Sequence, residues 1–139
     1  MKRRALAILL TAAVLIVLSL LATGAYATFD NIFPKAEPLS LPESGDILAF
    51  TIVTDTGKPI SLTSDEQAAL LQSLRTAQPT RKMTLNDVPD VRPYTQIDLT
   101  DSVRDYRIFV YEEAAQVFVD IPYTGIYCTD QATLSLLTP

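Results

Sequence analysis

Residues that usually carry acid–base and metal chemistry are scarce in this chain. Histidine is absent, and Cys128 is the only cysteine among 139 residues. The absence of histidine removes the usual general base at neutral pH, together with the Ser-His and Cys-His nucleophile systems. It also removes a principal zinc ligand, and a single cysteine does not replace it. We therefore expect no cofactor, no metal site and no catalytic residue of these classes, and we expect that the protein is not an enzyme.

Carboxylates are the remaining route to acid–base catalysis. Glu112 and Glu113 are adjacent at the tip of an expected hairpin, where their side chains would point apart. Asp98, Asp101 and Asp105 fall near one end of the expected sheet, and a solvated strand end explains these acids equally well. A carboxylate-based hydrolase, with or without a metal ion, is therefore kept as the alternative function.

A second group of polar residues could bind a ligand without transforming it. Arginine offers a two-pronged donor to a carboxylate or phosphate, and tyrosines beside a glycine turn can line a shallow groove. The candidate binding surface consists of Arg81, Lys82, Asn86, Asp87, Arg92, Tyr123 and Tyr127. Two simpler interpretations stay open: the cations pair with surface acids, and at least one tyrosine packs in the core. Asn86, Asp87 and Asp90 do not match the alternating pattern of a calcium-binding loop. Two interpretations of them stay open: an Asx turn, and oxygen ligands of an irregular calcium site.

The elements that must position these residues follow from the apolar periodicity. Strands are expected at 47–54, 59–62, 94–100, 104–111 and 116–121, with a strand remnant at 122–127. A helix should begin at Thr63 or Ser64, because Thr63 and Glu66 have capping-box spacing, and it should end before Pro79. A second helix is expected at 130–137. The order is ββαβββα, which predicts an α+β fold with a small antiparallel sheet packed against one or two helices.

Apolar residues on both faces of the expected strands indicate that other parts of the chain cover both faces of the sheet. Leu70, Leu71 and Leu74 recur at helical spacing and form the face that the helix would bury. Phe109 and Phe118 lie on the strand face opposite to most of the aliphatic residues. We therefore expect a second layer of cover, and the long segment 79–93 is expected to be a loop.

The N-terminus is typical of an exported or membrane-anchored chain. Residues 5–22 form an uncharged, mostly apolar run directly behind the basic residues 2–4. Eighteen helical residues at a rise of about 1.5 Å each reach about 27 Å, close to the hydrocarbon thickness of a bilayer. Because basic residues stay on the cytoplasmic side, we expect a cytoplasmic N-terminus and an extracytoplasmic domain. Ala25-Tyr26-Ala27 also fits a signal-peptide cleavage site, so residues 1–27 are either a single-pass anchor or a signal removed after Ala27.

The residues after position 27 form an acidic chain with room for one small domain. They carry eight Lys and Arg against sixteen Asp and Glu, a net charge of −8. Such a charge argues against binding to nucleic acid. Residues 28–45 contain Pro34, Pro38 and Pro42 without helical or alternating periodicity, and we expect them to form an extended tether. The globular domain would then be 46–139, and a single cysteine means that it forms no internal disulfide.

Two motifs in the globular part resemble a small family of exported bacterial proteins. One is AQPTRK at 77–82 followed by LNDVP at 85–89, and the other is IPYTGIY at 121–127. Together and in this order they make residues 46–137 similar to the domain-of-unknown-function family 5301. The resemblance implies a short N-terminal export segment and a compact α+β domain. It implies no activity, cofactor or catalytic residue.

These observations together predict a non-catalytic binding or accessory module of the cell envelope. One N-terminal helix would hold the domain outside the cell membrane, unless cleavage after Ala27 releases it. The expected partners are the membrane, through that helix, and an envelope protein or peptide.

Overall fold

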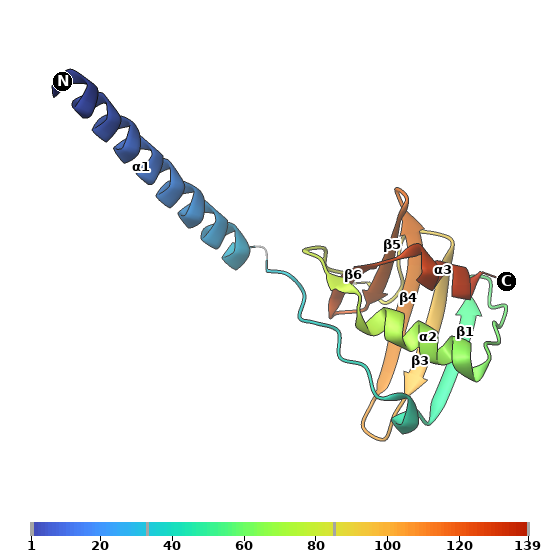
Figure 1. Ribbon diagram of the computed structural model, residues 1–139. Helices are drawn as coiled ribbons and strands as arrows, with labels where there is room; N and C mark the ends of the chain where they lie inside the picture. Colours follow the sequence, from blue (N-terminus) through green and yellow to red (C-terminus); the bar gives the residue numbers. More distant parts are fainter. Residues whose placement is uncertain (1, 33, 85, 139) are drawn as a thin grey trace. The chain divides into compact units, whose positions relative to one another are not determined.

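The structure is a computed structural model that describes residues 2–32, 34–84 and 86–138 (Figure 1). Four positions lie outside the described residues: 1 in the expected anchor, 33 in the expected tether, 85 in the family motif and 139 at the end of the expected domain. The chain divides into two compact units, residues 1–34 and 35–139. Each unit is considered by itself.

The first unit is one helix, α1 (Lys2–Ile32). Its segment Leu10–Phe29 has a mean hydropathy of 2.1 and is not buried, so it is long and apolar enough to cross a membrane or to act as a signal sequence. Three hydroxyl groups along it donate to backbone carbonyls one turn earlier, from Ser19, Thr23 and Thr28. Bonding within the helix lowers the cost of placing these polar groups in lipid. The expectation of a single apolar N-terminal helix is confirmed.

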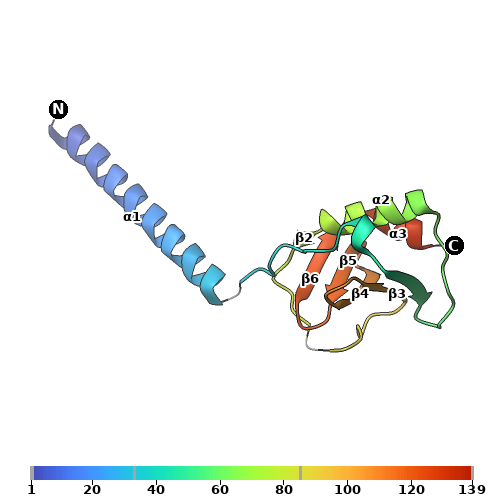
Figure 2. The same cartoon turned by 90° about the horizontal axis from the view of Figure 1, so that it is seen from below.

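The second unit is an α+β domain built on one six-stranded antiparallel sheet, as the sequence predicts. The strand order is β1-β3-β4-β5-β6-β2. The strands are β1 (Ala49–Thr54), β2 (Gln78–Pro79), β3 (Tyr94–Thr100), β4 (Asp105–Glu113), β5 (Gln116–Ile121) and β6 (Gly125–Thr129). The helices are the short 3-10 helix η1 (Ser44–Asp46), α2 (Ser64–Arg75) and α3 (Gln131–Leu137). Figures 1 and 2 show α2 and α3 together on one face of the sheet.

The main core lies between the sheet and these two helices. Ile97 pairs with Ile52 on one side and with Ile108 on the other, so three adjacent strands present aliphatic side chains to the same layer. Burial alternates along β3, as expected for a strand with one face turned to the core. From α2 the buried residues are Leu70, Leu71 and Leu74, and from α3 they include Leu137.

Helix α2 begins at the capping box that the sequence predicts. The backbone N–H of Glu66 donates to Thr63 Oγ1 at 3.3 Å, and the backbone N–H of Thr63 donates to Glu66 Oε2 at 2.8 Å. The bond from the Thr63 N–H, together with a second from the Thr63 hydroxyl at 2.8 Å, lowers the pKa of the Glu66 carboxyl below its ordinary value. Two N–H groups that a helix leaves unpaired at its start are thereby satisfied.

Two elements differ from the expected order. Residues 59–62 form no strand: an isolated antiparallel bridge joins Val53 to Pro59, and beside it the Ile60 N–H donates to Ile52 O at 2.9 Å. In contrast, the expected strand remnant at 122–127 overlaps a full strand, β6, which continues to Thr129 and pairs with β5 and with the two-residue β2.

Part of the extended tether that the sequence predicts for residues 28–45 packs against the domain. The Ala36 N–H donates to Thr80 O at 3.0 Å, and the Tyr127 hydroxyl donates to Glu37 O at 2.8 Å. Ala36, Leu39 and Leu41 pack against the main core. The prolines do keep this segment extended, but an extended chain beside a sheet edge can pair with it and bury alternate side chains. Residues 35–42, hereafter the docked segment, therefore belong to the domain.

The β4–β5 turn offers a direct test of backbone strain. Ala114 and Ala115 both have positive φ, 52° and 61°, as a two-residue type I′ turn requires. Alanine adopts this region at a cost, whereas Asn-Gly suits it, so the double change Ala114→Asn and Ala115→Gly should raise the free energy of unfolding by about 1 kcal/mol. Urea unfolding of the full-length protein in detergent micelles, followed by near-ultraviolet circular dichroism, measures the gain. Glycine at the exposed helical position Ala69 should instead cost about 1 kcal/mol, and a gain there or a loss at the turn would contradict the explanation.

Candidate functional site

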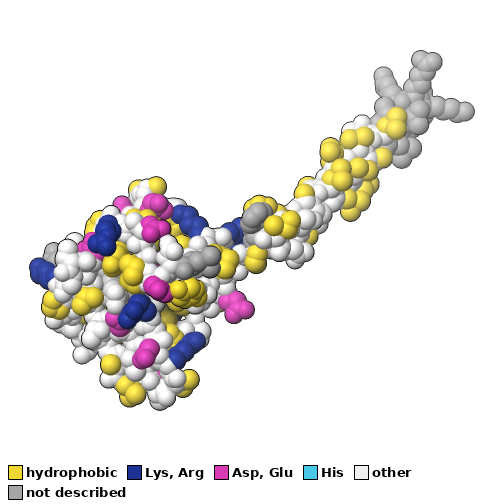
Figure 3. Space-filling model, turned by 180° about the vertical axis from the view of Figure 1, so that it is seen from behind, with side chains coloured by type: hydrophobic (Ala, Val, Ile, Leu, Met, Phe, Trp, Pro, Cys, Tyr) yellow, Lys and Arg dark blue, Asp and Glu magenta, His cyan; other side chains and the backbone are white. Residues whose placement is uncertain are grey.

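The second face of the sheet is covered by the long loop between β2 and β3, residues 80–93, hereafter the covering loop. It starts beside β6, where the Thr80 N–H donates to Ile126 O at 3.0 Å and the Ile126 N–H donates to Lys82 O at 3.3 Å. It ends at the other edge of the sheet, next to the turn that follows β1. There Arg92 Nη1 lies 3.7 Å from Asp55 Oδ2. The loop therefore crosses the face from the β6 side to the β1 side. Figure 3, drawn from behind, shows hydrophobic side chains on the domain interspersed with charges of both signs.

Under the covering loop a small second core forms. Tyr111, Phe118 and Ile126 are buried there, with Val91 and Tyr94 packed against them. The sequence predicts this second layer from the positions of Phe109 and Phe118, both of which are buried.

A hollow of about 370 Å³ lies between the covering loop and the sheet. Its sheet side is formed by one residue from each of three adjacent strands, β4, β5 and β6. The lining residues are Met83, Thr84, Asn86, Pro89, Asp90, Val91, Tyr111, Asp120 and Ile126.

Asp120 is the unusual member of this set. It lies on β5 opposite Phe109 and Ile126, and only 3% of its surface is exposed. Its Oδ1 atom is buried and has no hydrogen-bond partner among the described residues. Burial disfavours the charged form and raises the pKa of the Asp120 carboxyl to about 6. At pH 7 the group is still mostly ionised, in a ratio of about ten to one, so the hollow holds a buried negative charge.

Tyr111 lies next to this carboxyl. It pairs with Phe118 on β5 and is therefore a diagonal neighbour of Asp120 on the same face. Burial and the negative charges of Asp120 and Glu113 raise the pKa of the Tyr111 hydroxyl to about 12. The phenol stays neutral at physiological pH and can both donate and accept a hydrogen bond.

The rim of the hollow is held by contacts within the covering loop and to the β5–β6 turn. Asn86 Nδ2 donates to Asp90 Oδ2 at 3.0 Å, and the Asn86 N–H donates to Thr84 Oγ1 at 3.3 Å. The Tyr123 hydroxyl donates to Asp87 Oδ1 at 2.6 Å, which raises the pKa of that hydroxyl. Tyr123 has a φ of 61°, a conformation that is strained for a bulky residue. The turn and the loop are thus joined through a tyrosine.

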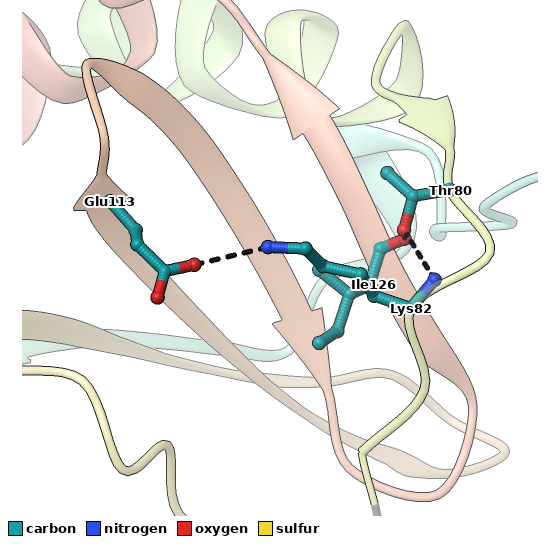
Figure 4. A network of polar contacts seen from close by, with 4 residues as sticks. All are labelled: Thr80, Lys82, Glu113 and Ile126. Atoms are coloured by element: carbon teal, nitrogen blue, oxygen red, sulfur yellow. Dashed lines mark hydrogen bonds and ion pairs between the residues drawn. The ribbon is translucent and has the colours of Figure 1, made fainter.

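Lys82 ties the start of the covering loop to the end of the β4–β5 hairpin (Figure 4). Its Nζ lies 3.0 Å from Glu113 Oε2. The same Nζ lies 4.2 Å from the centre of the Phe118 ring. Thr80 supports the same turn of chain, because its hydroxyl donates to Ile126 O at 2.6 Å and accepts from the Lys82 N–H at 3.1 Å. Lys82 is therefore engaged with the domain itself.

The structure separates the members of the expected binding surface. Asp87 and Tyr123 meet, and Asn86 lies beside them at the rim of the hollow. Arg81 is half-buried near the start of the covering loop, whereas Arg92 pairs at its other end.

Tyr127 differs from the expectation of an accessible surface residue. It is fully buried, on the helix side of the sheet, where its hydroxyl holds the docked segment at Glu37. The residue lies on β6 with its ring turned to the main core, and the alternation of a strand explains why its neighbour Ile126 faces the hollow instead.

Four of the five acids considered earlier for catalysis have structural contacts, among them Asp105, which accepts from the Thr100 hydroxyl at 2.7 Å. Asp98 accepts from Arg107 Nε at 2.9 Å, and Glu113 pairs with Lys82. Asp101 accepts from two backbone N–H groups of its own turn and from the Tyr106 hydroxyl, and these bonds lower the pKa of its carboxyl. Within the described ranges no group of three or more acids and cysteines is placed to hold a metal ion.

Asp120 and Tyr111 were not among the expected site residues. The available signal was Asp120 itself, the one charged residue within the apolar strand segment QVFVDI, on the same face as Phe118. A lone carboxylate on a face that also carries an aromatic residue indicates either an exposed edge or a buried functional group. The covering loop decides between these alternatives, because it buries this face of the sheet and Asp120 with it.

Comparison with known proteins identifies a family but assigns no chemistry. No curated protein and no solved structure matches the chain. Residues 35–128 match the model of the family DUF5301, which is described as "Domain of unknown function (DUF5300)". The match begins at the same residue as the second structural unit, and it includes the docked segment, the covering loop and Asp120. Because the match covers more than half of the sequence, the chain belongs to the DUF5301 family.

Proposed function

We propose that this protein is a non-catalytic binding module of the cell envelope, anchored by α1 with its domain outside the cytoplasm. The ligand site is the hollow under the covering loop, and the partner is an envelope protein or peptide. The length and hydropathy of α1 support the anchor, and the acidic charge of the remaining chain suits a domain that stays soluble. A reporter enzyme fused behind position 139 should be active only outside the cytoplasm.

One observation carries the proposal: the domain keeps a mostly ionised carboxyl, with one buried oxygen that lacks a partner, at the base of a hollow. Burying a charge without a partner is costly, and proteins tolerate the cost mainly at functional sites. Asp120 meets this description, because it is 97% buried and its Oδ1 lacks a partner within the described chain. A ligand that supplied the missing partner would recover the lost interaction. The long covering loop fits such a role, since long ordered loops commonly bind ligands.

Site-specific photo-cross-linking tests this assignment of the binding surface. A photoreactive amino acid at Met83, which lines the hollow and is 66% exposed, should form a defined adduct in membranes of the cell that produces the protein. The matched control is Val103 in the β3–β4 turn, which is 85% exposed and lies outside the hollow. We expect an adduct at Met83 that is absent at Val103. Identical adducts at both positions, or none at Met83, would contradict the proposed surface.

A carboxylate-based hydrolase is the second candidate, and one observation favours it. Asp120 and Asp90 line the same hollow, and a carboxyl with a pKa of about 6 is able to act as a general acid. If the protein is a hydrolase, an activity screen should reveal turnover that Asp120→Asn abolishes. Elemental analysis of the purified protein would show whether a metal takes part.

A further inference from the structure

The charge of the hollow restricts what it can bind. Asp120 lies at its base and Asp90 at its rim, while no lysine or arginine occurs among the described residues that line it. An anionic ligand would meet two carboxylates without a compensating cation, which costs free energy in a partly enclosed space. A purely apolar ligand would leave Asp120 without a partner. The occupant that satisfies both conditions is a cation that donates hydrogen bonds.

The arrangement suits an organic cation better than a metal ion. Calcium takes six to eight oxygen ligands around one point. The part of the chain that the structure describes offers no group of three or more metal-binding side chains. An ammonium group needs fewer partners, because it has three donors and is also attracted to the face of an aromatic ring. Asp120 and Tyr111 supply a carboxylate and a phenol on neighbouring strands.

The walls of the hollow add a preference for an apolar stem. Met83, Pro89 and Val91 contribute hydrophobic surface from the covering loop. Methionine is flexible and polarisable and adapts to stems of different shape. The volume of about 370 Å³ accommodates a short alkyl chain together with its charged end.

Resting on the binding function proposed above, we propose that the hollow binds a primary ammonium group on an unbranched alkyl stem, with Asp120 as its anionic partner and Tyr111 beside it. Lysine side chains and free alkylamines both present this group. The ammonium end lies against the sheet, and the stem passes Met83 toward solvent.

This assignment predicts a specific pH dependence. The groups around Asp120 that carry or take up charge are Tyr111 on β4 and Asp90 on the covering loop, with the Glu113–Lys82 pair at the end of the hairpin. Tyr111 stays neutral below pH 10, since its pKa is about 12, and an alkylammonium stays charged, since its pKa is about 10. Asp120 loses its charge on acidification through about pH 6. Affinity for an ammonium ligand should therefore fall about tenfold between about pH 7 and about pH 5.

Titration of the isotope-labelled full-length protein in detergent micelles with n-butylammonium chloride tests the proposal. Amide resonances of β5 and of residues 83, 84, 86–88, 90 and 91 should shift with a saturable, millimolar dissociation constant that rises about tenfold at the lower pH. Neutral 1-butanol and sodium chloride serve as controls and should give at least tenfold weaker effects. Asp120→Asn should weaken butylammonium binding at least tenfold and remove its pH dependence, whereas Asp46→Asn, which removes one exposed carboxylate elsewhere, should change it less than twofold.

Two further outcomes separate this inference from the proposed function. N-acetyl-lysine amide should compete with butylammonium if the source is a lysine side chain, and it should fail to compete if only free amines fit. Absence of saturable shifts, or equal binding by Asp120→Asn, would overturn the ammonium assignment. Should the Met83 cross-link persist in that case, the covering loop would still be a binding surface and only the ligand class would be wrong.

Discussion

Replacing Asp120 by asparagine should stabilise the domain at neutral pH but much less at acidic pH. Burial raises the carboxyl pKa from 3.8 to about 6, so the folded state binds this proton more tightly than the unfolded state. The contribution of the group to stability is therefore fully present below about pH 4 and is lost as the pH rises through about 6. A shift of about two units corresponds to about 3 kcal/mol. The difference in unfolding free energy between Asp120→Asn and the wild type should accordingly grow by up to about 3 kcal/mol between about pH 4 and about pH 7.

Urea unfolding of both full-length proteins in the same detergent, at four or more pH values, measures this difference. Buried Tyr111 and Tyr127 provide the near-ultraviolet circular dichroism signal. Asp46→Asn is the matched control, because it removes the same side-chain charge at an exposed position. A flat difference for Asp120→Asn, or one that grows toward acidic pH, would show that the Asp120 carboxyl is not buried and unpaired.

The largest loss of stability is expected from Gly125→Ala. A Cβ atom at this position would lie 2.5 Å from the Cβ of Ala36 in the docked segment, which is far inside van der Waals contact. The backbone φ of Gly125 is also 156°, which alanine rarely adopts. Overpacking and backbone strain together should cost about 2–4 kcal/mol. Hydrogen exchange at the Ala36 amide, which is bonded to Thr80 O, should accelerate with it.

A double-mutant cycle isolates the contact between the two positions. Ala36→Gly removes the opposing Cβ atom, so in the Gly125→Ala background it should restore about 1–3 kcal/mol, while in the wild-type background it should cost less than about 1 kcal/mol. Additive effects of the two changes would mean that Ala36 does not lie against Gly125. The docked segment would then be the extended tether that its prolines indicate.

The sequence predicts those parts of the fold that rest on local patterns. The alternation in β3, the leucine spacing in α2 and the capping box at Thr63 each follow from residues close together in the chain. The α+β class and the apolar N-terminal helix follow in the same way. Each of these features depends on periodicity and capping, which operate over a few residues.

The parts that the sequence does not predict depend on residues far apart. Docking of residues 35–42 needs the missing Cβ of Gly125 and the hydroxyl of Tyr127, which lies 90 positions after its partner Glu37. Similarly, the site residue Asp120 becomes notable only because the covering loop buries its face of the sheet. Local periodicity predicts neither the docking of residues 35–42 nor the burial of Asp120, because a strand pattern does not say which segment covers each face of the sheet.

The separation of the expected surface residues has the same origin. Lys82 and Arg92 are only ten positions apart in the sequence, yet they lie at opposite ends of the covering loop. Lys82 pairs with Glu113 on β4, and Arg92 pairs with Asp55 in the turn after β1. Conversely, Asp87 and Tyr123 are 36 positions apart and share a hydrogen bond. Proximity along a loop is therefore a poor guide to proximity in space when the loop crosses a whole sheet.

A carboxyl titration by carbon-13 NMR tests the central claim most directly. That claim is that Asp120 is buried beneath the covering loop and that its Oδ1 atom has no partner among the described residues. In the full-length protein in detergent micelles, the Asp120 side-chain carboxyl should titrate with a midpoint near 6. A midpoint near 4, the ordinary value for a solvated aspartate, would contradict it.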